Sequence, residues 1–178
     1  HPATKARGTP SSRIPWIEMQ DLISLFSSAP ISQVEMRARV QRLEDELRKY
    51  PQLEEHVTHH FSPGLYAREL FIPKGAILTG KIHRMAHLNV MPVGDLSVLT
   101  EHGVKRLTGP CVIQSAAGIK RAGCAHEDTI WITIHSNPDD ERDLQKLEAR
   151  YIAPDFDALE GMDVQPDLIE GAFSAKAG

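Results

Sequence analysis

The chain is poor in several features that mark common functional classes. It has two cysteines, Cys111 and Cys124, which are too few for a disulfide framework. Lys and Arg total 20 against 24 Asp and Glu, and no basic stripe appears, so we expect no nucleic-acid partner. No apolar run approaches the ~20 residues of a membrane helix, so we expect no membrane partner. We interpret the cysteines as small buried hydrophobes in a protein made in the cytoplasm.

What is present describes one folded domain with appendages. Hydrophobic residues make up 41% of the chain, which is enough for a core, and 178 residues suit a single domain. Changes in composition and the positions of Gly and Pro divide the chain into four segments. They are an arm with a short helix (1–30), a helix with a connector (31–64), a β-barrel (65–136), and a C-terminal helix with an extended tail (137–178).

The clearest helix is predicted over residues 33–50. Ser32 and Glu35 have the spacing of a capping box, in which both side chains satisfy N–H groups at the helix start, and Pro51 ends the helix. Apolar residues then recur at alternating spacings of four and three, which is typical of a coiled-coil seam. This seam either packs on the chain's own barrel or forms a short contact between subunits of a homo-oligomer.

The arm and the tail carry few apolar side chains to offset the entropy of ordering them, roughly 1–2 kcal/mol per residue. We therefore expect both segments to dock on partner subunits. A short amphipathic helix is predicted over residues 16–27, and Leu168, Ile169 and Phe173 would anchor the tail. The residues expected at subunit interfaces are Trp16, Leu22, Phe26, Met36, Val40, Leu43 and Leu47.

From Leu65 onward, short apolar runs alternate with Gly and Pro, which indicates an all-β barrel or sandwich. The last run alternates cleanly, with one face made of Ile130, Ile132 and Ile134. Asn137-Pro138 then has the pattern of a helix start, and Pro154 would end that helix. The sequence therefore predicts a mainly β domain followed by a short helix.

The run from Gly75 to Gly94 resembles the first metal-binding motif of the cupin superfamily. In that family the two glycines enclose a His-x-His pair and a glutamate. Here the glycines and the spacing match, but Lys81 stands at the place of the first histidine. His83 matches the second histidine, and His87 stands at the place of the glutamate.

The second cupin motif is matched more loosely from Gly109 onward. Ala116 falls at its proline, Arg121 at its histidine and Ala125 at its asparagine. The resemblance implies a cupin-type barrel, meaning a double-stranded β-helix or jelly roll. Together with the helices predicted from the residues, the expected fold is a mainly β chain with N-terminal helices and a short C-terminal helix and tail. It also implies that the final metal ligand of an ordinary cupin is missing.

Three occupants of the barrel interior remain open. Lys81 and Arg121 are cationic, so they would repel a divalent metal and would suit an anionic ligand. A barrel that has lost its metal, filled by polar side chains, would explain the same residues. A surviving site for a divalent metal would use histidines: His83, His87, and His126 or His135. We expect no tightly bound cofactor, name no catalytic residue, and favour a protein that is not an enzyme.

Several stretches are similar to a group of small cupin-like proteins of bacteriophages and prophages. They lie between residues 57 and 135 and include 57–61, 78–83 and 126–135. The resemblance implies a non-enzymatic structural protein of a phage particle, such as a capsid decoration, neck or tail accessory subunit. It would be made in the host cytoplasm, reside in the virion, and contact copies of itself and other virion proteins. The alternatives are a metal-dependent cupin enzyme, such as an isomerase or dioxygenase, and a module that binds a small ligand or glycan.

Overall fold

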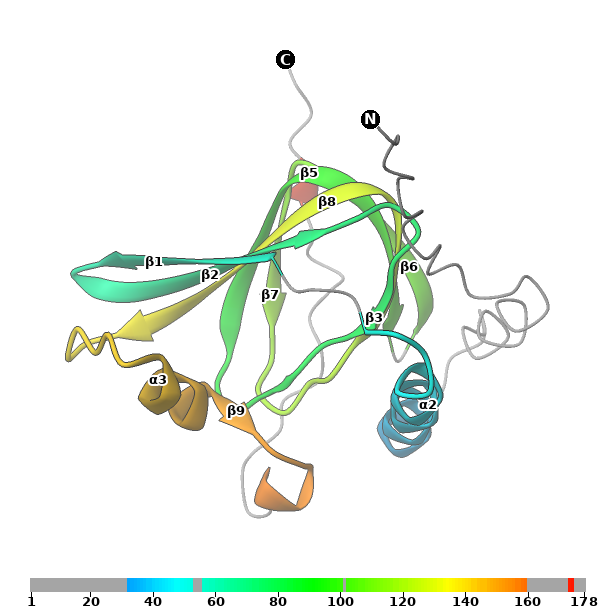
Figure 1. Cartoon of the computed structure of the whole chain (residues 1–178), viewed down its shortest axis with the longest axis horizontal. Coiled ribbons are helices and arrows are strands. Elements are labelled where there is room, and N and C mark those ends of the chain that lie inside the picture. Colours follow the sequence, from blue (N-terminus) through cyan, green and yellow to red (C-terminus); the bar gives the residue numbers. More distant parts are fainter. Residues whose placement is uncertain (1–31, 53–55, 101, 160–172, 175–178) are drawn as a thin grey trace, which may run out of the picture.

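A computed structural model describes residues 32–52, 56–100, 102–159 and 173–174, and in this part the chain is mainly β (Figure 1). The helices are α2 (Gln33–Leu47) and α3 (Leu144–Tyr151), with a short 3₁₀ turn η1 (Asp157–Leu159) after them. The strands are β1 (His56–Ser62), β2 (Gly64–Ile72), β3 (Ile77–Thr79), β4 (Ile82–His83), β5 (His87–Thr100), β6 (Gly103–Thr108), β7 (Cys111–Ser115), β8 (Ala122–Asn137), β9 (Ile152–Ala153) and β10 (Phe173–Ser174). None of the described helices is long and apolar enough to cross a membrane.

Two long strands, β5 and β8, form the centre of the fold. The main sheet runs β1-β2-β8-β5-β7-β10, while β3 adds to β8 and β6 adds to β5, and every pairing is antiparallel. One half of β8 pairs with β2 and the other half with β3, so the strand belongs to both sides of the barrel. The sheet therefore curls round an interior instead of lying flat.

A bend in β5 makes this curl possible. The pairing of β5 with β8 shifts register between Val90 and Leu96, and Gly94 lies inside this irregular stretch with a φ of 128°. A side chain at this backbone angle would be strained, and bulges of this kind increase strand curvature. The core between the two sides is built from aliphatic residues, with Met91 and Ile113 almost completely buried.

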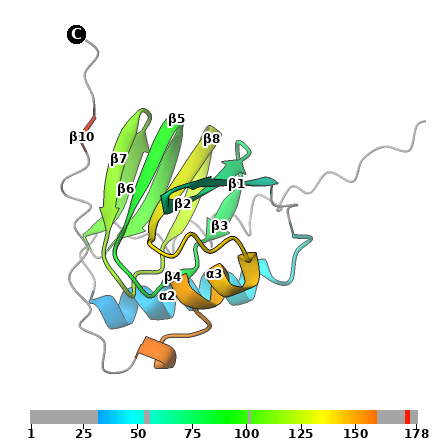
Figure 2. The same ribbon diagram turned by 90° about the vertical axis from the view of Figure 1, so that its left-hand side faces the viewer.

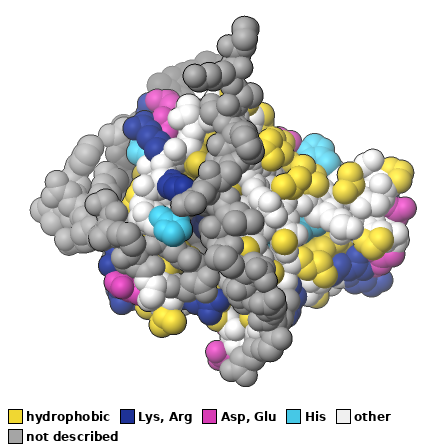
Figure 3. All heavy atoms as spheres, turned by 180° about the vertical axis from the view of Figure 1, so that it is seen from behind, with side chains coloured by type: hydrophobic (Ala, Val, Ile, Leu, Met, Phe, Trp, Pro, Cys, Tyr) yellow, Lys and Arg dark blue, Asp and Glu magenta, His cyan; other side chains and the backbone are white. Residues whose placement is uncertain are grey.

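The isoleucines of β8 face outward, and its polar residues face the interior. Thr129, Thr133 and His135 are buried, whereas Ile132 and Ile134 are only half-buried on the other face. Neighbouring strands continue this outer apolar surface, with exposed Leu88 and Val112. Hydrophobic side chains are visible on the surface seen from behind (Figure 3). The polar lining of the interior separates this barrel from one filled only by a hydrophobic core.

Helix α2 begins as the sequence predicts and ends slightly earlier. Ser32 Oγ accepts a hydrogen bond from the Glu35 backbone N–H at 3.1 Å, which is the expected cap. The helix ends at Leu47, and Tyr50 N–H then bonds to Leu47 O at 3.1 Å in a tighter turn before Pro51. Figure 2 shows α2 and α3 at the same end of the strands.

The seam of α2 packs on the chain's own barrel, which corrects the expected subunit interface. Met36, Val40 and Leu43 are buried in a cluster with Leu99 and Ala122 of the sheet. Leu47 packs against the same cluster. An ion pair of 2.6 Å between Glu44 and Lys120 also ties the helix to the barrel. These four seam residues therefore have their partners within one chain, and Trp16, Leu22 and Phe26 lie outside the described residues.

Two element boundaries differ from those predicted. The strands begin at His56 rather than Leu65, because the alternating run 56–62 forms β1 and pairs with β2 in a hairpin. The C-terminal helix begins after Asp143, not at Asn137, because the Asp143 carboxylate accepts the Gln145 and Lys146 N–H groups and caps the helix there. Asn137 instead ends β8. Leu168 and Ile169, expected to anchor the tail, lie outside the described residues.

Candidate metal centre

Three histidines from different strands meet inside the barrel. His83 ends β4, His87 begins β5 and His135 lies near the end of β8. One ring nitrogen from each lies within 4.8 Å of the other two, and His83 Nδ1 is 3.2 Å from His135 Nε2. The pairing of β5 with β8 places Leu88 beside Ile134 on the outer face, so His87, just before Leu88, and His135, just after Ile134, both turn inward. We call His83, His87 and His135 the histidine trio.

Neighbouring groups fix the orientation of two rings of the histidine trio. His87 Nδ1 lies 3.0 Å from Met85 O, and because a carbonyl oxygen only accepts, Nδ1 is the donor of this hydrogen bond. The His135 ring stacks on Tyr151 with ring centres 4.2 Å apart, and Tyr151 Oη donates to Ser136 O at 2.6 Å. Partners of this kind orient the histidines of metal sites. Helix α3 therefore positions His135 through Tyr151.

The environment keeps His83 and His135 neutral. Burial is the main cause that lowers the pKa of His83 to about 2, and the neighbouring His87 and His135 add to it. Burial likewise lowers the pKa of His135 to about 4, with a contribution from His87. A neutral imidazole has a nitrogen lone pair, which is the form that binds a metal. Both rings are thus in the metal-binding state at neutral pH.

We expect the metal-free protein to lose stability as the pH falls from about 6.5 toward about 4. In this window the unfolded chain takes up protons on His83 and His135, while the folded chain does not. The free energy of unfolding should therefore fall by up to about 1.4 kcal/mol per pH unit for each histidine. Urea unfolding in the presence of a chelator, at about pH 7, 5.5 and 4.5, measures this slope.

The control for this pH dependence is the exposed His60, which bonds to Glu69 on the surface. His60→Gln should keep the slope, whereas His135→Gln should make it shallower because one depressed pKa is removed. A free energy of unfolding that stays constant across the window would contradict the neutral, buried state of these rings.

The donor set fits a divalent transition metal. Two nitrogens that bind one Zn²⁺ at about 2.05 Å in tetrahedral geometry lie about 3.3 Å apart. The 3.2 Å between His83 Nδ1 and His135 Nε2 is close to this separation. Imidazole nitrogens are suited to Zn²⁺, Cu²⁺, Fe²⁺ and Ni²⁺ rather than to Ca²⁺ or Mg²⁺. Among the described residues, no carboxylate or thiolate joins the histidine trio.

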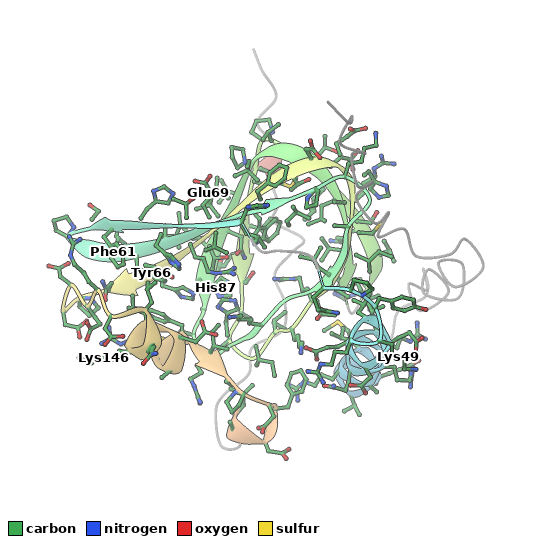
Figure 4. The ribbon with its side chains drawn as sticks, viewed as in Figure 1. Lys49, Phe61, Tyr66, Glu69, His87 and Lys146 are labelled. Atoms are coloured by element: carbon green, nitrogen blue, oxygen red, sulfur yellow. The ribbon has the colours of Figure 1, made fainter. Side chains whose placement is uncertain are left out.

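The histidine trio lies on the wall of a cavity of about 140 Å³ inside the barrel. Figure 4 shows Tyr66 and His87 pointing into the space between β2 and α3, with Glu69 on the other side of β2. Asn89 also lines the cavity, and its Oδ1 accepts hydrogen bonds from Trp131 Nε1 at 3.0 Å and Thr133 Oγ1 at 2.8 Å. This buried network fixes the polar part of the wall.

The structure brings some of the expected site residues together and separates others. Arg121 lines the cavity and donates to Ser115 Oγ at 2.7 Å. Lys81 lines the rim, where its Nζ donates to Glu148 Oε1 at 2.6 Å and remains half exposed. His126 is not part of the histidine trio, because its Nε2 lies 2.7 Å from Ser97 Oγ.

Two features of the site have no signal in the sequence motifs. Arg68 lines the cavity from β2, and Tyr151 of α3 holds His135. The strand pattern from Leu65 places Arg68 on an inward-facing position, which is the one hint available. The expectation of no tightly bound metal is based partly on repulsion between Lys81 and a divalent ion. This repulsion is weaker than expected because Glu148 binds the Lys81 ammonium group at the rim of the cavity.

Comparisons with known proteins give matches to solved structures. No family model matches this chain, and no curated protein matches it. A cupin domain from Bordetella pertussis Tohama I matches with a TM-score of 0.39 and 16% identity, over 49% of this chain and 97% of that one. KdgF from a Halomonas species matches with a TM-score of 0.39 and 19% identity, over 53% of this chain and 88% of that one.

A mutant of the oxalate decarboxylase OxdC from Bacillus subtilis also matches, with a TM-score of 0.42 and 14% identity. This match covers 58% of this chain and 29% of that one. The curled antiparallel sheet, with a helix before and after it, confirms the predicted mainly β fold class, and the matched structures are cupin-type proteins. These matches do not link the chain to a bacteriophage protein.

Proposed function

We propose that the barrel binds one divalent first-row transition metal ion through the histidine trio, and that the protein is a metal-dependent enzyme acting on a small molecule in the cavity. The observation that carries this proposal is the convergence of three ring nitrogens within 4.8 Å on the wall of that cavity. Structural zinc sites use four protein ligands, whereas catalytic sites use three and leave a position for substrate or water. Three histidines beside a cavity match the second type.

The chain's own residues have separate roles in this proposal. His83, His87 and His135 hold the ion, which when bound supplies a Lewis acid. Met85 orients His87 through its carbonyl, and Tyr151 orients His135 by stacking. Burial of the ligand rings limits water around the site, which strengthens electrostatic interactions there. The cavity wall supplies the surface on which a small molecule binds.

A structural role in a phage particle has less support. The described seam of α2 is buried in the chain's own core, so it offers no surface for a subunit contact. Virion localisation and contacts with other virion proteins stay predictions, as does the homo-oligomer. The buried, converging histidines favour the metal-dependent alternative because polar rings inside a purely structural barrel cost desolvation energy.

We expect the wild-type protein, once a chelator has removed any bound metal and has itself been removed, to bind about one Zn²⁺ or Co²⁺ per chain. His87→Ala or His135→Ala should abolish tight binding. Each substitution removes one of three donors, and two histidines hold a divalent ion poorly. Isothermal titration and elemental analysis of the purified protein measure the stoichiometry. At a free metal concentration of 100 times Kd, binding should also raise the free energy of unfolding by about 2.7 kcal/mol.

The matched control is His126→Ala. His126 lies in the same barrel but bonds to Ser97, so its loss should leave metal binding unchanged. Circular dichroism of each variant establishes that it remains folded. Wild-type protein that takes up no stoichiometric metal would refute the proposal, as would a His126→Ala variant that loses the metal while His135→Ala keeps it.

A further inference from the structure

The cavity has two chemically different ends. One end holds the histidine trio and two arginines: on β2, Arg68 follows Tyr66, the partner of His135, and Arg121 bonds to Ser115, the partner of His87. Further along β2 and β8 the inward side chains become apolar, and the lining there consists of Leu70, Ile72, Leu78, Leu96, Val98 and Trp131. A ligand that fills this space must present a polar or charged group to one end and an apolar body to the other.

Both arginines reach the neighbourhood of the histidine trio: Arg68 from β2, the strand next to His135, and Arg121 from the loop just before β8. On β2, Tyr66 is the partner of His135 and Arg68 is the partner of Thr133, so Arg68 enters the cavity one inward position along the strand. On β7, Ser115 is the partner of His87, and Arg121 Nη1 donates to Ser115 Oγ. Two guanidinium groups therefore approach the trio from two sides.

Arg121 is held in place by a buried hydrogen-bond chain. Ser115 Oγ accepts both Arg121 Nη1 and Asn89 Nδ2, each at 2.7 Å, and Ser115 is completely buried. Asn89 is in turn fixed by Trp131 and Thr133. A pre-oriented guanidinium loses little side-chain entropy when it binds a ligand. The Arg121 side chain is therefore already ordered in the folded protein before a ligand binds.

The charged side chains that line the cavity favour an anionic ligand. Among the described residues, the cavity lining has three cationic side chains, Arg68, Lys81 and Arg121, and one acidic side chain, Glu148. The lining thus carries a net charge of +2, three minus one, before any metal is bound. A divalent ion on the neutral histidines would add two more positive charges. Planar guanidinium groups pair well with carboxylates through two parallel hydrogen bonds.

The size of the cavity limits the apolar body. A protein cavity of about 150 Å³ accommodates benzene, and this one measures about 140 Å³. Because this volume is that of the whole cavity, the apolar body is limited to one ring or a short branched alkyl group. Substrates with several rings or sugars would extend beyond the cavity.

We infer that the site accepts a small monocarboxylate with one apolar ring or branched alkyl body, with its carboxylate bound by Arg121 at the end of the cavity occupied by the histidine trio. The inference deepens the proposed function, on which it rests for the metal. The apolar body lies among the leucines and Trp131 at the other end. Arg68 adds to the positive charge around the carboxylate.

The test compares four probes on the Co²⁺-loaded and on the metal-free full-length protein. Phenylacetate has both the carboxylate and the apolar ring, whereas phenylacetamide has the ring without the negative charge. Acetate has the carboxylate without the ring, and inorganic phosphate is an anion of different shape. Isothermal titration gives the affinities, and the visible absorption of bound Co²⁺ reports whether the anion changes the metal's surroundings. We expect phenylacetate to bind at least about tenfold more tightly than each of the other three.

Two substitutions assign this preference to Arg121. Arg121→Gln should weaken phenylacetate binding by at least about tenfold and leave phenylacetamide binding unchanged. The matched control Arg106→Gln removes an arginine that pairs with Asp95 on the surface, and it should leave both affinities unchanged. The comparison of phenylacetate with phenylacetamide on the wild type needs no variant, so it stands even where Arg121→Gln does not fold.

The outcomes separate this inference from the proposed function. Protein that takes up no Co²⁺ but prefers phenylacetate in its metal-free form supports the carboxylate site and refutes the metal. Protein that binds Co²⁺ but binds phenylacetamide or phosphate as tightly as phenylacetate refutes the carboxylate site and keeps the metal. A phenylacetate affinity that Arg121→Gln leaves unchanged also overturns the inference.

Discussion

Leu43→Ala is expected to lower the free energy of unfolding by about 2–5 kcal/mol. Leu43 is 1% exposed and packs with Leu99 and Ala122, so its removal leaves a cavity between α2 and the sheet. In a chain of this length, such a loss should lower the melting temperature by roughly 5–15 °C. Urea unfolding followed by circular dichroism measures the change.

Val34→Ala is the control on the same helix, because Val34 is 76% exposed. Its free energy of unfolding should stay within about 0.5 kcal/mol of the wild type. The Leu43→Ala effect should also be independent of protein concentration, since the contact lies within one chain. A destabilisation that appears only through dissociation of an oligomer would show that the seam is a subunit interface instead.

Gly94→Ala is expected to destabilise the barrel by about 3–5 kcal/mol. Gly94 has a φ of 128°, and a Cβ atom there would stand 2.7 Å from the Cα atom of Thr129. Thr129 is completely buried, and its Oγ1 bonds to Asp95 N–H and to Glu127 O, so it cannot move away without breaking these contacts. The new methyl group would force β5 and β8 apart at the bend.

Gly80→Ala provides the matched control for this substitution. A Cβ atom at Gly80 would lie 3.6 Å from Arg121 O, an ordinary contact, and the backbone there does not need a glycine. Gly80→Ala should leave the free energy of unfolding unchanged or raise it by up to about 1 kcal/mol. Equal stabilities of the two variants would mean that the bend at Gly94 tolerates a side chain.

Local signals in the sequence predict the elements better than their partners. The capping box at Ser32 and the spacing of the seam specify α2, because caps and periodicity depend on neighbours a few residues away. The same periodicity does not show which surface covers the seam. A helix face has the same apolar pattern whether it packs on the chain's own barrel or on another subunit. The helix start at Asp143 was equally ambiguous, because Asn137-Pro138 offers a competing cap.

The site was predictable only where the motif spacing specifies it. His83 and His87 lie four residues apart on two strands that follow each other in the chain, and the glycines around them predict a barrel interior. The third donor depends on which residues of β8 face β5, and this register is set by long-range pairing. His126 and His135 are both candidates from sequence, and only the pairing of Leu88 with Ile134 brings His135 to the trio.

The central position of β8 has a consequence for synthesis of the protein. β2, β3 and β5 all pair with β8, yet β8 is the last long strand to leave the ribosome. Until Asn137 emerges, the earlier strands lack their shared partner and keep unpaired edges. Such edges are sites of aggregation, and the growing chain exposes them until β8 is complete. Folding of the barrel must therefore follow translation of β8.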